Sequence, residues 1–116
     1  MDGPIFFETR AHVLVCTGPR CSNAGSRRLF DQATVELERT RVAYYKDGGS
    51  VRLTESGCLG ACAYGPTAVA YYEAQSGGLR EAWYVGMDAR RLVRLATALH
   101  DDSSPPDEGR FDPHGT

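Results

Sequence analysis

Residues 11–30 read AHVLVCTGPRCSNAGSRRLF, and this stretch changes character twice. Residues 11–16 form a short run rich in β-branched side chains, which predicts a buried strand that ends at Cys16. The following residues, 17–25, are dense in turn formers and predict a loop. Ser26 can then cap a helix. The apolar residues of that helix recur at helical spacing, at Leu29, Phe30, Ala33 and Leu37. The stretch therefore predicts the opening of a β-α-β unit.

The end of this helix is open to two interpretations. The stretch VAYYKDGGS (42–50) can continue the helix to about Lys46, where the two following glycines would stop it. It can equally form a strand that turns through DGG into the next segment. We favour the helix, because the two adjacent tyrosines extend the apolar face of Ala33 and Leu37.

Three further strands and a second helix follow. Residues 51–54 alternate between apolar and polar side chains and predict the second strand. Residues 67–73 predict the third strand, and residues 81–87 predict the fourth, which a QSGG turn joins antiparallel to the third. Asp88 is a suitable N-cap for a closing helix. The apolar face of that helix consists of Leu92, Leu95, Ala96 and Leu99.

The two ends of the chain differ in composition from this middle part. Residues 1–10 form a lead-in, and residues 101–116 are acidic, contain proline and have few apolar side chains, which predicts a disordered tail. The domain therefore spans residues 11–100. Its β-α-β-β-β-α order predicts an α/β sandwich with a mixed four-stranded sheet and two main helices. This order resembles that of the thioredoxin-like fold.

The composition excludes several classes of protein. The chain has 116 residues, enough for one domain with its own core. Its formal net charge is −2, so it lacks the basic balance expected of a protein that binds nucleic acid. No apolar run approaches the ~20 residues of a membrane span, and the first residues lack the stages of a signal peptide. We therefore expect a cytoplasmic protein with neither a nucleic-acid nor a membrane partner.

Four cysteines carry the chemistry that the sequence suggests. In a reducing compartment, clustered cysteines more often bind metal or react than form stable disulfides. Cys16 and Cys21 follow the first predicted strand, whereas Cys58 and Cys62 follow the second. If these strands are parallel neighbours, all four sulfurs gather at the carboxyl end of the sheet, where ligands bind in open α/β sheets.

Three kinds of site use four converging thiolates. Zinc takes four in a tetrahedron, but C-x3-C is an unusual zinc knuckle. A pair of redox-active dithiols would show C-x-x-C, which this sequence lacks. A 2Fe-2S cluster needs two protein sulfurs on each iron, which suits two local cysteine pairs. The glycines between and beside the cysteines allow backbone N–H groups to approach the sulfurs, although turn chemistry explains each glycine as well.

Other side chains are weaker candidates. The three histidines lack ligand-type spacing, so we expect them to face solvent or lie satisfied in the core. Arg20, Arg27 and Arg28 flank the cysteines and form either a docking rim for an acidic partner or a solvated helix start. Trp83 and the tyrosines of the hairpin predict sheet packing. The sequence contains no pair of catalytic carboxylates, activated nucleophile or phosphate-binding loop.

The pattern HVLVC…C…GSRRLF, followed by TESGCLGACAYGPTAVAYYE and WYVGMD, resembles the thioredoxin-like 2Fe-2S ferredoxins over roughly residues 11–100. It is also similar to the small 2Fe-2S subunit of NADH:quinone oxidoreductases and NAD-linked hydrogenases. Those subunits share the short C-x4-C loop but carry an N-terminal helical extension that this chain lacks. The stretch WYVGMDARRLVRLA matches the free-standing type. The resemblance therefore favours a free-standing ferredoxin with a compact first loop.

The resemblance implies that Cys16, Cys21, Cys58 and Cys62 bind one 2Fe-2S cluster, the first two on one iron and the last two on the other. It further implies a one-electron carrier rather than an enzyme, with redox proteins as partners and a homodimer as the common assembly. It also predicts a cis bond between residues 65 and 66. The alternatives are an electron-transfer subunit of an NADH dehydrogenase or hydrogenase and, less favoured, a four-cysteine zinc domain.

Overall fold

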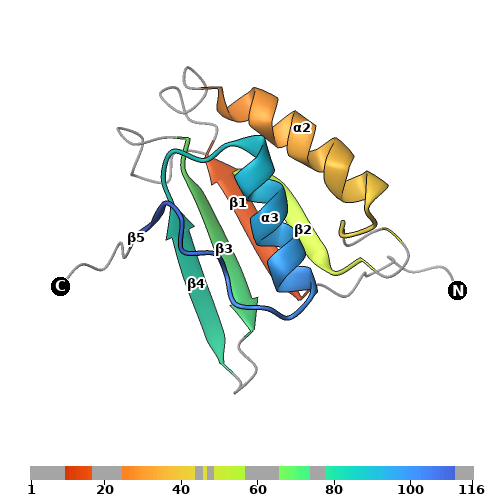
Figure 1. The fold of residues 1–116 in the computed structure, drawn as a ribbon, viewed down its shortest axis with the longest axis vertical. Helices are drawn as coiled ribbons and strands as arrows, with labels where there is room; N and C mark the ends of the chain where they lie inside the picture. Colours follow the sequence, from red (N-terminus) through yellow and green to blue (C-terminus); the bar gives the residue numbers. More distant parts are fainter. Residues whose placement is uncertain are drawn as a thin grey trace, which may run out of the picture.

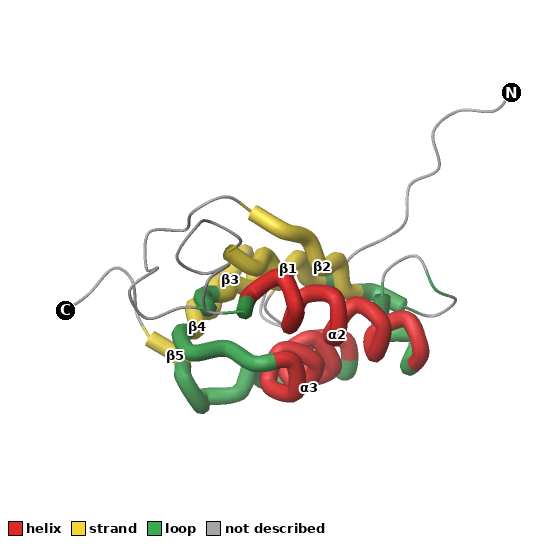
Figure 2. Tube along the Cα trace, turned by 90° about the horizontal axis from the view of Figure 1, so that it is seen from above, coloured by secondary structure: helices red, strands yellow, loops and turns green. Residues whose placement is uncertain are grey.

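The computed structural model of the chain describes residues 10–16, 25–43, 46, 49–56, 66–73 and 78–111. Its strands form one mixed sheet in the order β2-β1-β3-β4-β5. Both helices lie on the same side of this sheet, so the molecule has two layers (Figures 1 and 2). In chain order the elements are β1 (Ala11–Cys16), α2 (Ser26–Arg39), β2 (Val51–Ser56), β3 (Ala68–Glu73), β4 (Leu79–Tyr84), α3 (Ala89–His100) and β5 (Arg110–Phe111).

The β-α-β unit has the topology that the sequence predicts. β1 pairs in parallel with β2, and the register runs from Ala11 opposite Val51 to Cys16 opposite Ser56. All other neighbouring strands pair antiparallel. Because parallel neighbours cannot be joined by a tight turn, the chain crosses over through α2. The predicted α/β class and thioredoxin-like order are confirmed.

The core lies between the sheet and the helices. Alternate residues of β1 face this layer, and Val13 and Val15 are fully buried. α2 contributes Leu29, Ala33 and Leu37 at helical spacing, and α3 contributes the predicted face from Leu92 to Leu99. Burial of each large aliphatic side chain stabilises the fold by about 1.5–3 kcal/mol.

The first helix ends earlier than predicted, at Arg39 and not at about Lys46. Arg41 has a left-handed backbone with φ 62°, which turns the chain back, and the N–H groups of Val42 and Ala43 both donate to the carbonyl of Leu37. Val42 and Ala43 are then buried in the core, and Ala43 makes an isolated parallel bridge with Val51. Burial of these two residues against β2 replaces the extra helical turn.

The helix starts also differ in part from prediction. The N-cap of α2 is Gly25, whose φ of 94° suits glycine, and Ser26 is the first residue inside the helix. The prediction that Ser26 caps the helix is therefore wrong. The prediction for α3 is confirmed, because the Asp88 carboxylate accepts a hydrogen bond of 2.8 Å from the N–H of Arg91.

The strand bounds shift by a few residues. β2 runs on to Ser56, two residues past the predicted end, and β3 starts one residue later than predicted. β4 covers residues 79–84 and not 81–87. After it, Gly86 has φ 57°, and the Met87 N–H donates to the carbonyl of Pro66. This contact ends the ladder and directs the chain into α3.

Residues beyond 100 contradict the prediction of a disordered tail where the structure describes them. Arg110 and Phe111 form β5, which pairs with Tyr84 and Trp83, so the sheet has five strands and not four. The Tyr84 hydroxyl donates a hydrogen bond of 2.7 Å to the carbonyl of Pro106. The guanidinium of Arg91 donates to the carbonyls of Gly86 and Glu108. Local composition could not reveal these long-range contacts.

The ionisation of the Tyr84 hydroxyl allows its contact with the segment around Pro106 to be tested. Burial raises the pKa of Tyr84 to about 12. Below about pH 10 the group is neutral in both the folded and the unfolded chain, so its contribution to stability is complete. Between about pH 10 and 12 the unfolded chain ionises first, and the free energy of unfolding falls.

We expect Tyr84→Phe to lower the free energy of unfolding by about 1 kcal/mol at neutral pH, because the hydroxyl donor is lost. The variant should also lose part of the alkaline fall in stability. Urea unfolding across the pH range measures both effects. The matched control is Tyr71→Phe, at a part-buried tyrosine of β3 whose hydroxyl forms no such bond within the described residues. Equal alkaline behaviour of the wild type and Tyr84→Phe would contradict the prediction.

Candidate metal centre

One of the four predicted ligands lies in the described part of the structure. Cys16 is the last residue of β1, has no exposed surface, and its N–H donates to the carbonyl of Thr67 at 2.9 Å. Cys21, Cys58 and Cys62 lie outside the described residues. The predicted cis bond between residues 65 and 66 also involves a residue outside them.

The described chain ends show where the cysteine-bearing segments attach. Cys16 and Ser56 lie opposite each other at the carboxyl ends of the two parallel strands. Segment 17–24 leaves from Cys16 and returns at Gly25, while segment 57–65 leaves from Ser56 and returns at Pro66. Both segments are therefore anchored at one edge of the sheet (Figure 1). The parallel pairing on which the predicted convergence of the four sulfurs depends is confirmed.

Ser26 is an unusual feature of this edge. Its side chain is fully buried, and its Oγ has no hydrogen-bond partner within the described part of the chain. Ser26 shares the inward face of α2 with Leu29, Ala33 and Leu37, so it faces the sheet at the start of the helix. A buried hydroxyl without a partner costs roughly 1–3 kcal/mol. Ser26 precedes Leu29 by three residues, so helical spacing alone could have predicted that it lies on the buried face. Its assignment as the N-cap prevented that prediction.

The start of α2 also favours negative charge. The first N–H groups of a helix have no partner within it, and the helix dipole places partial positive charge there. The first turn contains no acidic residue, and Arg27 and Arg28 are both exposed in it. Thiolates or other anionic sulfur at this edge would therefore meet a favourable electrostatic environment.

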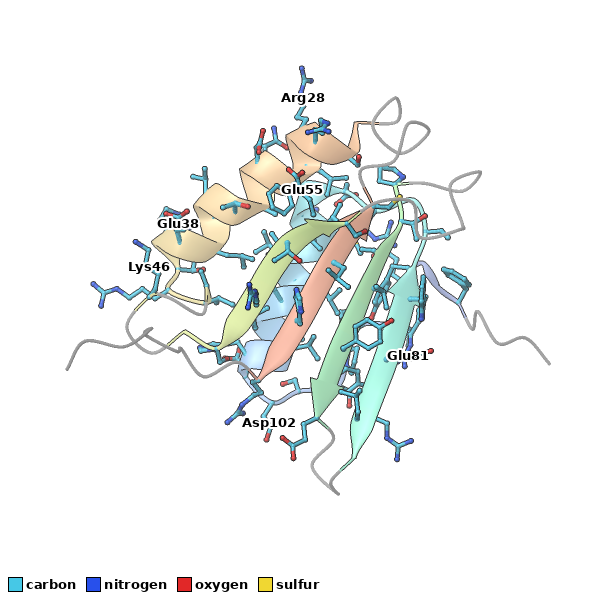
Figure 3. The ribbon with its side chains drawn as sticks, turned by 180° about the vertical axis from the view of Figure 1, so that it is seen from behind. Arg28, Glu38, Lys46, Glu55, Glu81 and Asp102 are labelled. Atoms are coloured by element: carbon cyan, nitrogen blue, oxygen red, sulfur yellow. The ribbon has the colours of Figure 1, made fainter. Side chains whose placement is uncertain are left out.

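The arginines flanking the edge are only partly neutralised. Arg27 lies 3.9 Å from the carboxylate of Glu55 in an exposed ion pair, which contributes little to stability. Arg28 projects from α2 into solvent (Figure 3). Arg20 lies outside the described residues. The arrangement fits both interpretations of this cluster, a docking rim and a solvated helix start.

The histidines in the described residues are engaged elsewhere. His12 Nε2 lies 2.8 Å from the hydroxyl of Thr54, and burial together with the charge of Arg52 lowers the pKa of His12. His100 Nδ1 lies 2.7 Å from the hydroxyl of Ser50. Within the described ranges, no group of three His, Cys, Asp or Glu side chains could hold a metal ion. These contacts fit the expectation that the histidines face solvent or lie satisfied in the core, and His114 lies outside the described residues.

Trp83 packs as the sequence predicts. It pairs with Val69 of β3, and its ring meets that of Phe111 edge-on with the centroids 6.2 Å apart.

None of the helices in the described part of the chain is long and apolar enough to cross a membrane.

Comparisons with known proteins identify relatives of this arrangement. A family model described as thioredoxin-like [2Fe-2S] ferredoxin matches residues 7–77. The structure is similar to the wild-type thioredoxin-like [2Fe-2S] ferredoxin from Aquifex aeolicus, with 21% identity, a TM-score of 0.68, and coverage of 90% of this chain and 98% of that one. A second structure of a thioredoxin-like [2Fe-2S] ferredoxin from Aquifex aeolicus has 22% identity, a TM-score of 0.64, and coverage of 93% and 98%. At these identities the likeness to solved structures is one of fold. No curated protein sequence matches the chain.

Proposed function

Because this chain belongs to the thioredoxin-like [2Fe-2S] ferredoxin family, which carries a 2Fe-2S cluster, we propose that it is a one-electron carrier whose cluster is held by its four cysteines. Cys16 and Cys21 hold one iron, and Cys58 and Cys62 hold the other. The observation that carries this proposal is the position of Cys16, buried at the carboxyl end of β1 directly opposite the end of β2.

Covalent geometry supports the ligand set. Neighbouring strands lie about 4.8 Å apart, and two residues span at most about 7 Å. Cys58 follows Ser56 by two residues, and Ser56 lies opposite Cys16. The chain can therefore bring a thiolate of the second pair beside Cys16 without any change in the sheet.

The residues at this edge also fit the group chemically. A 2Fe-2S cluster bound by four thiolates carries net negative charge and accepts one electron. The hydroxyl of Ser26, which has no partner among the described residues, and the first N–H groups of α2 are donors for such charge. Burial of Cys16 excludes water from one ligand. In this proposal the protein binds and insulates the cluster and sets its potential, and it breaks no bond of a substrate.

The partner that we propose is an acidic redox protein. It would dock where Arg28 projects into solvent at the start of α2 (Figure 3). Opposite charges on the two proteins would raise the rate of encounter more than the affinity. The cytoplasmic location, the homodimer and the choice between a free-standing carrier and a subunit of an NADH dehydrogenase or hydrogenase complex stay predictions.

Metal analysis tests the proposed function directly. After anaerobic purification we expect a brown protein with about two iron and two acid-labile sulfide per chain, as a 2Fe-2S cluster requires. A colourless protein with one zinc would instead indicate the four-cysteine zinc domain. Co-purification with a flavoprotein would indicate the subunit, whereas a protein purified alone with full iron content would indicate the free-standing carrier.

The second cysteine pair has its own test. We expect Cys58→Ala and Cys62→Ala each to abolish the cluster or destabilise it badly, because a thiolate ligand is removed from one iron. Visible absorption and iron content measure the loss. Ser56→Ala, on the same edge but outside the proposed ligand set, should retain the cluster. A normal visible spectrum in both cysteine variants would remove these residues from the ligand set.

Ser26 provides a separate prediction. We expect Ser26→Ala to lower the reduction potential, because a hydroxyl that donates to sulfur stabilises the added electron. A tenfold change in the ratio of reduced to oxidised protein, about 59 mV for one electron, is the order of magnitude expected. Redox titration followed by EPR measures the shift. Ser50→Ala, whose hydroxyl contacts His100, is the control and should leave the potential unchanged. An unshifted potential in Ser26→Ala would assign that hydroxyl a role in packing alone.

Arg28 tests the proposed docking surface. We expect Arg28→Glu to slow oxidation of the reduced cluster by ferricyanide and to speed oxidation by hexaamminecobalt(III), because the charge near the cluster changes sign. Both effects should shrink as ionic strength rises. Stopped-flow absorbance measures the rates. Arg41→Glu, at an exposed position just past the far end of α2, makes the same change of charge away from the cysteines, and equal effects in the two variants would contradict docking at the start of α2.

A further inference from the structure

A cavity of about 560 Å³ lies at the end of the sheet away from Cys16. Tyr72 of β3 lines it, and this residue lies opposite Ala11, at the start of β1. β1 has six residues, a length of about 20 Å, so the part of the cavity that Tyr72 lines lies at the opposite end of the strand from the proposed cluster. From there the cavity extends toward Arg110 of β5. The volume falls within the range of small-molecule sites.

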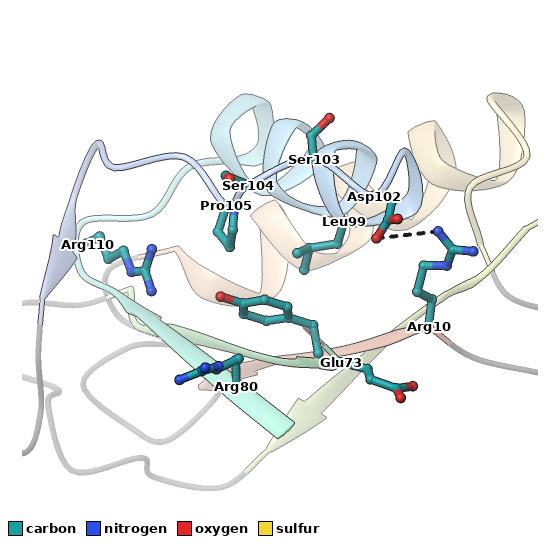
Figure 4. Close-up of a pocket in the computed structure, with 10 residues that line it drawn as sticks. Arg10, Glu73, Arg80, Leu99, Asp102, Ser103, Ser104, Pro105 and Arg110 are labelled. Atoms are coloured by element: carbon teal, nitrogen blue, oxygen red, sulfur yellow. Dashed lines mark ion pairs between the residues drawn. The ribbon is translucent and has the colours of Figure 1, made fainter. Parts of the chain in front are cut away.

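The cavity is lined by basic side chains that come from separate parts of the chain. Arg80 of β4 and Arg110 of β5 reach its two sides, while Arg10 lies at its far end (Figure 4). Arg10 is paired with Asp102 at 3.7 Å. Within the part of the chain that the structure describes, Arg80 and Arg110 form no ion pair, and Glu73 is the one further carboxylate that lines the cavity.

The remaining lining supplies hydroxyls and apolar surface. Tyr72 lies opposite Arg80 in the register of β3 and β4, on the face that the helices cover. Leu99 and the segment 103–105 form the opposite wall (Figure 4). A few convergent polar groups on a partly apolar cavity are typical of a site for a small organic ligand.

The wall formed by the C-terminal segment is fixed in place. The Tyr84 hydroxyl holds the carbonyl of Pro106, and the Arg91 guanidinium holds the carbonyl of Glu108. Gly109 has φ 76°, and a Cβ at this position would clash with the Arg91 side chain. β5 then pairs with β4 and brings Arg110 to the rim. These contacts preorganise the cavity, which lowers the entropy lost on binding.

We propose that this cavity binds a small organic oxyanion, a carboxylate or a phosphate ester. Guanidinium groups bind both with two parallel hydrogen bonds, and two such groups on one cavity repel each other until an anion lies between them. The hydroxyl groups lining the cavity add donors, and Tyr72, Leu99 and Pro105 offer surface to the body of the ligand. The proposal does not depend on the cluster.

Calorimetric titration of the purified full-length protein tests the site. The probes are pyrophosphate and citrate, each against sodium chloride at matched ionic strength. We expect saturable binding of at least one probe. Arg80→Gln and Arg110→Gln should each weaken it about tenfold or more, because each removes a charged donor. Binding of pyrophosphate alone indicates phosphate, binding of citrate alone indicates carboxylate, and binding of both indicates an oxyanion site without further selection.

Arg90→Gln on the exposed surface of α3 makes the same change of charge and should bind as the wild type does. Backbone NMR shifts on titration should centre on residues 72, 80, 99 and 110. A lowered melting temperature of Arg110→Gln would show that this change disrupts β5. Arg80→Gln, at the exposed end of β4, then decides the result by itself. The proposal is overturned if neither probe binds above chloride, or if Arg90→Gln weakens binding as much as Arg80→Gln does.

Discussion

Parallel pairing of β1 with β2 is the constraint on which the rest of this structure depends. The register from Ala11 opposite Val51 to Cys16 opposite Ser56 places both carboxyl ends at one edge of the sheet. Parallel neighbours need a long crossover, so α2 must pack across the sheet, and its first turn returns to the same edge. Cysteine-bearing segments that are far apart in the sequence are thereby anchored side by side.

The same pairing creates a strongly polarised edge. A fully buried cysteine, a fully buried serine hydroxyl without a described partner and the first N–H groups of a helix meet there, with exposed guanidinium groups around them. The serine hydroxyl, the helix N–H groups and the guanidinium groups each favour negative charge or electron-rich sulfur nearby. The 2Fe-2S cluster that this family carries supplies negative charge and electron-rich sulfur of this kind.

The opposite end of the sheet is organised by different contacts. There Leu99 and the segment 103–105 form one wall of a basic cavity, and the chain then runs back along the sheet to β5, which pairs with Trp83 and Tyr84 at the Cys16 end. The cysteine end and the cavity both adjoin β1 and β3, but in the described part of the chain no residue belongs to both sites. The fold can therefore carry an electron-transfer site at one end and a ligand site at the other, with little direct coupling between them.

Local patterns were sufficient for the elements whose residues interact mainly with near neighbours. The periodicity of residues 26–37 and 89–100, the Asp88 cap and the β-branched run of β1 predicted their elements, and cysteine spacing with the family resemblance predicted the cluster. Contacts between residues distant in the chain decided the rest. Packing of Val42 and Ala43 against β2 ended α2 at Arg39, and the Tyr84 hydroxyl fixed a segment whose composition predicts disorder. Such contacts have no local signal, because their energy comes from partners that only the folded chain brings together.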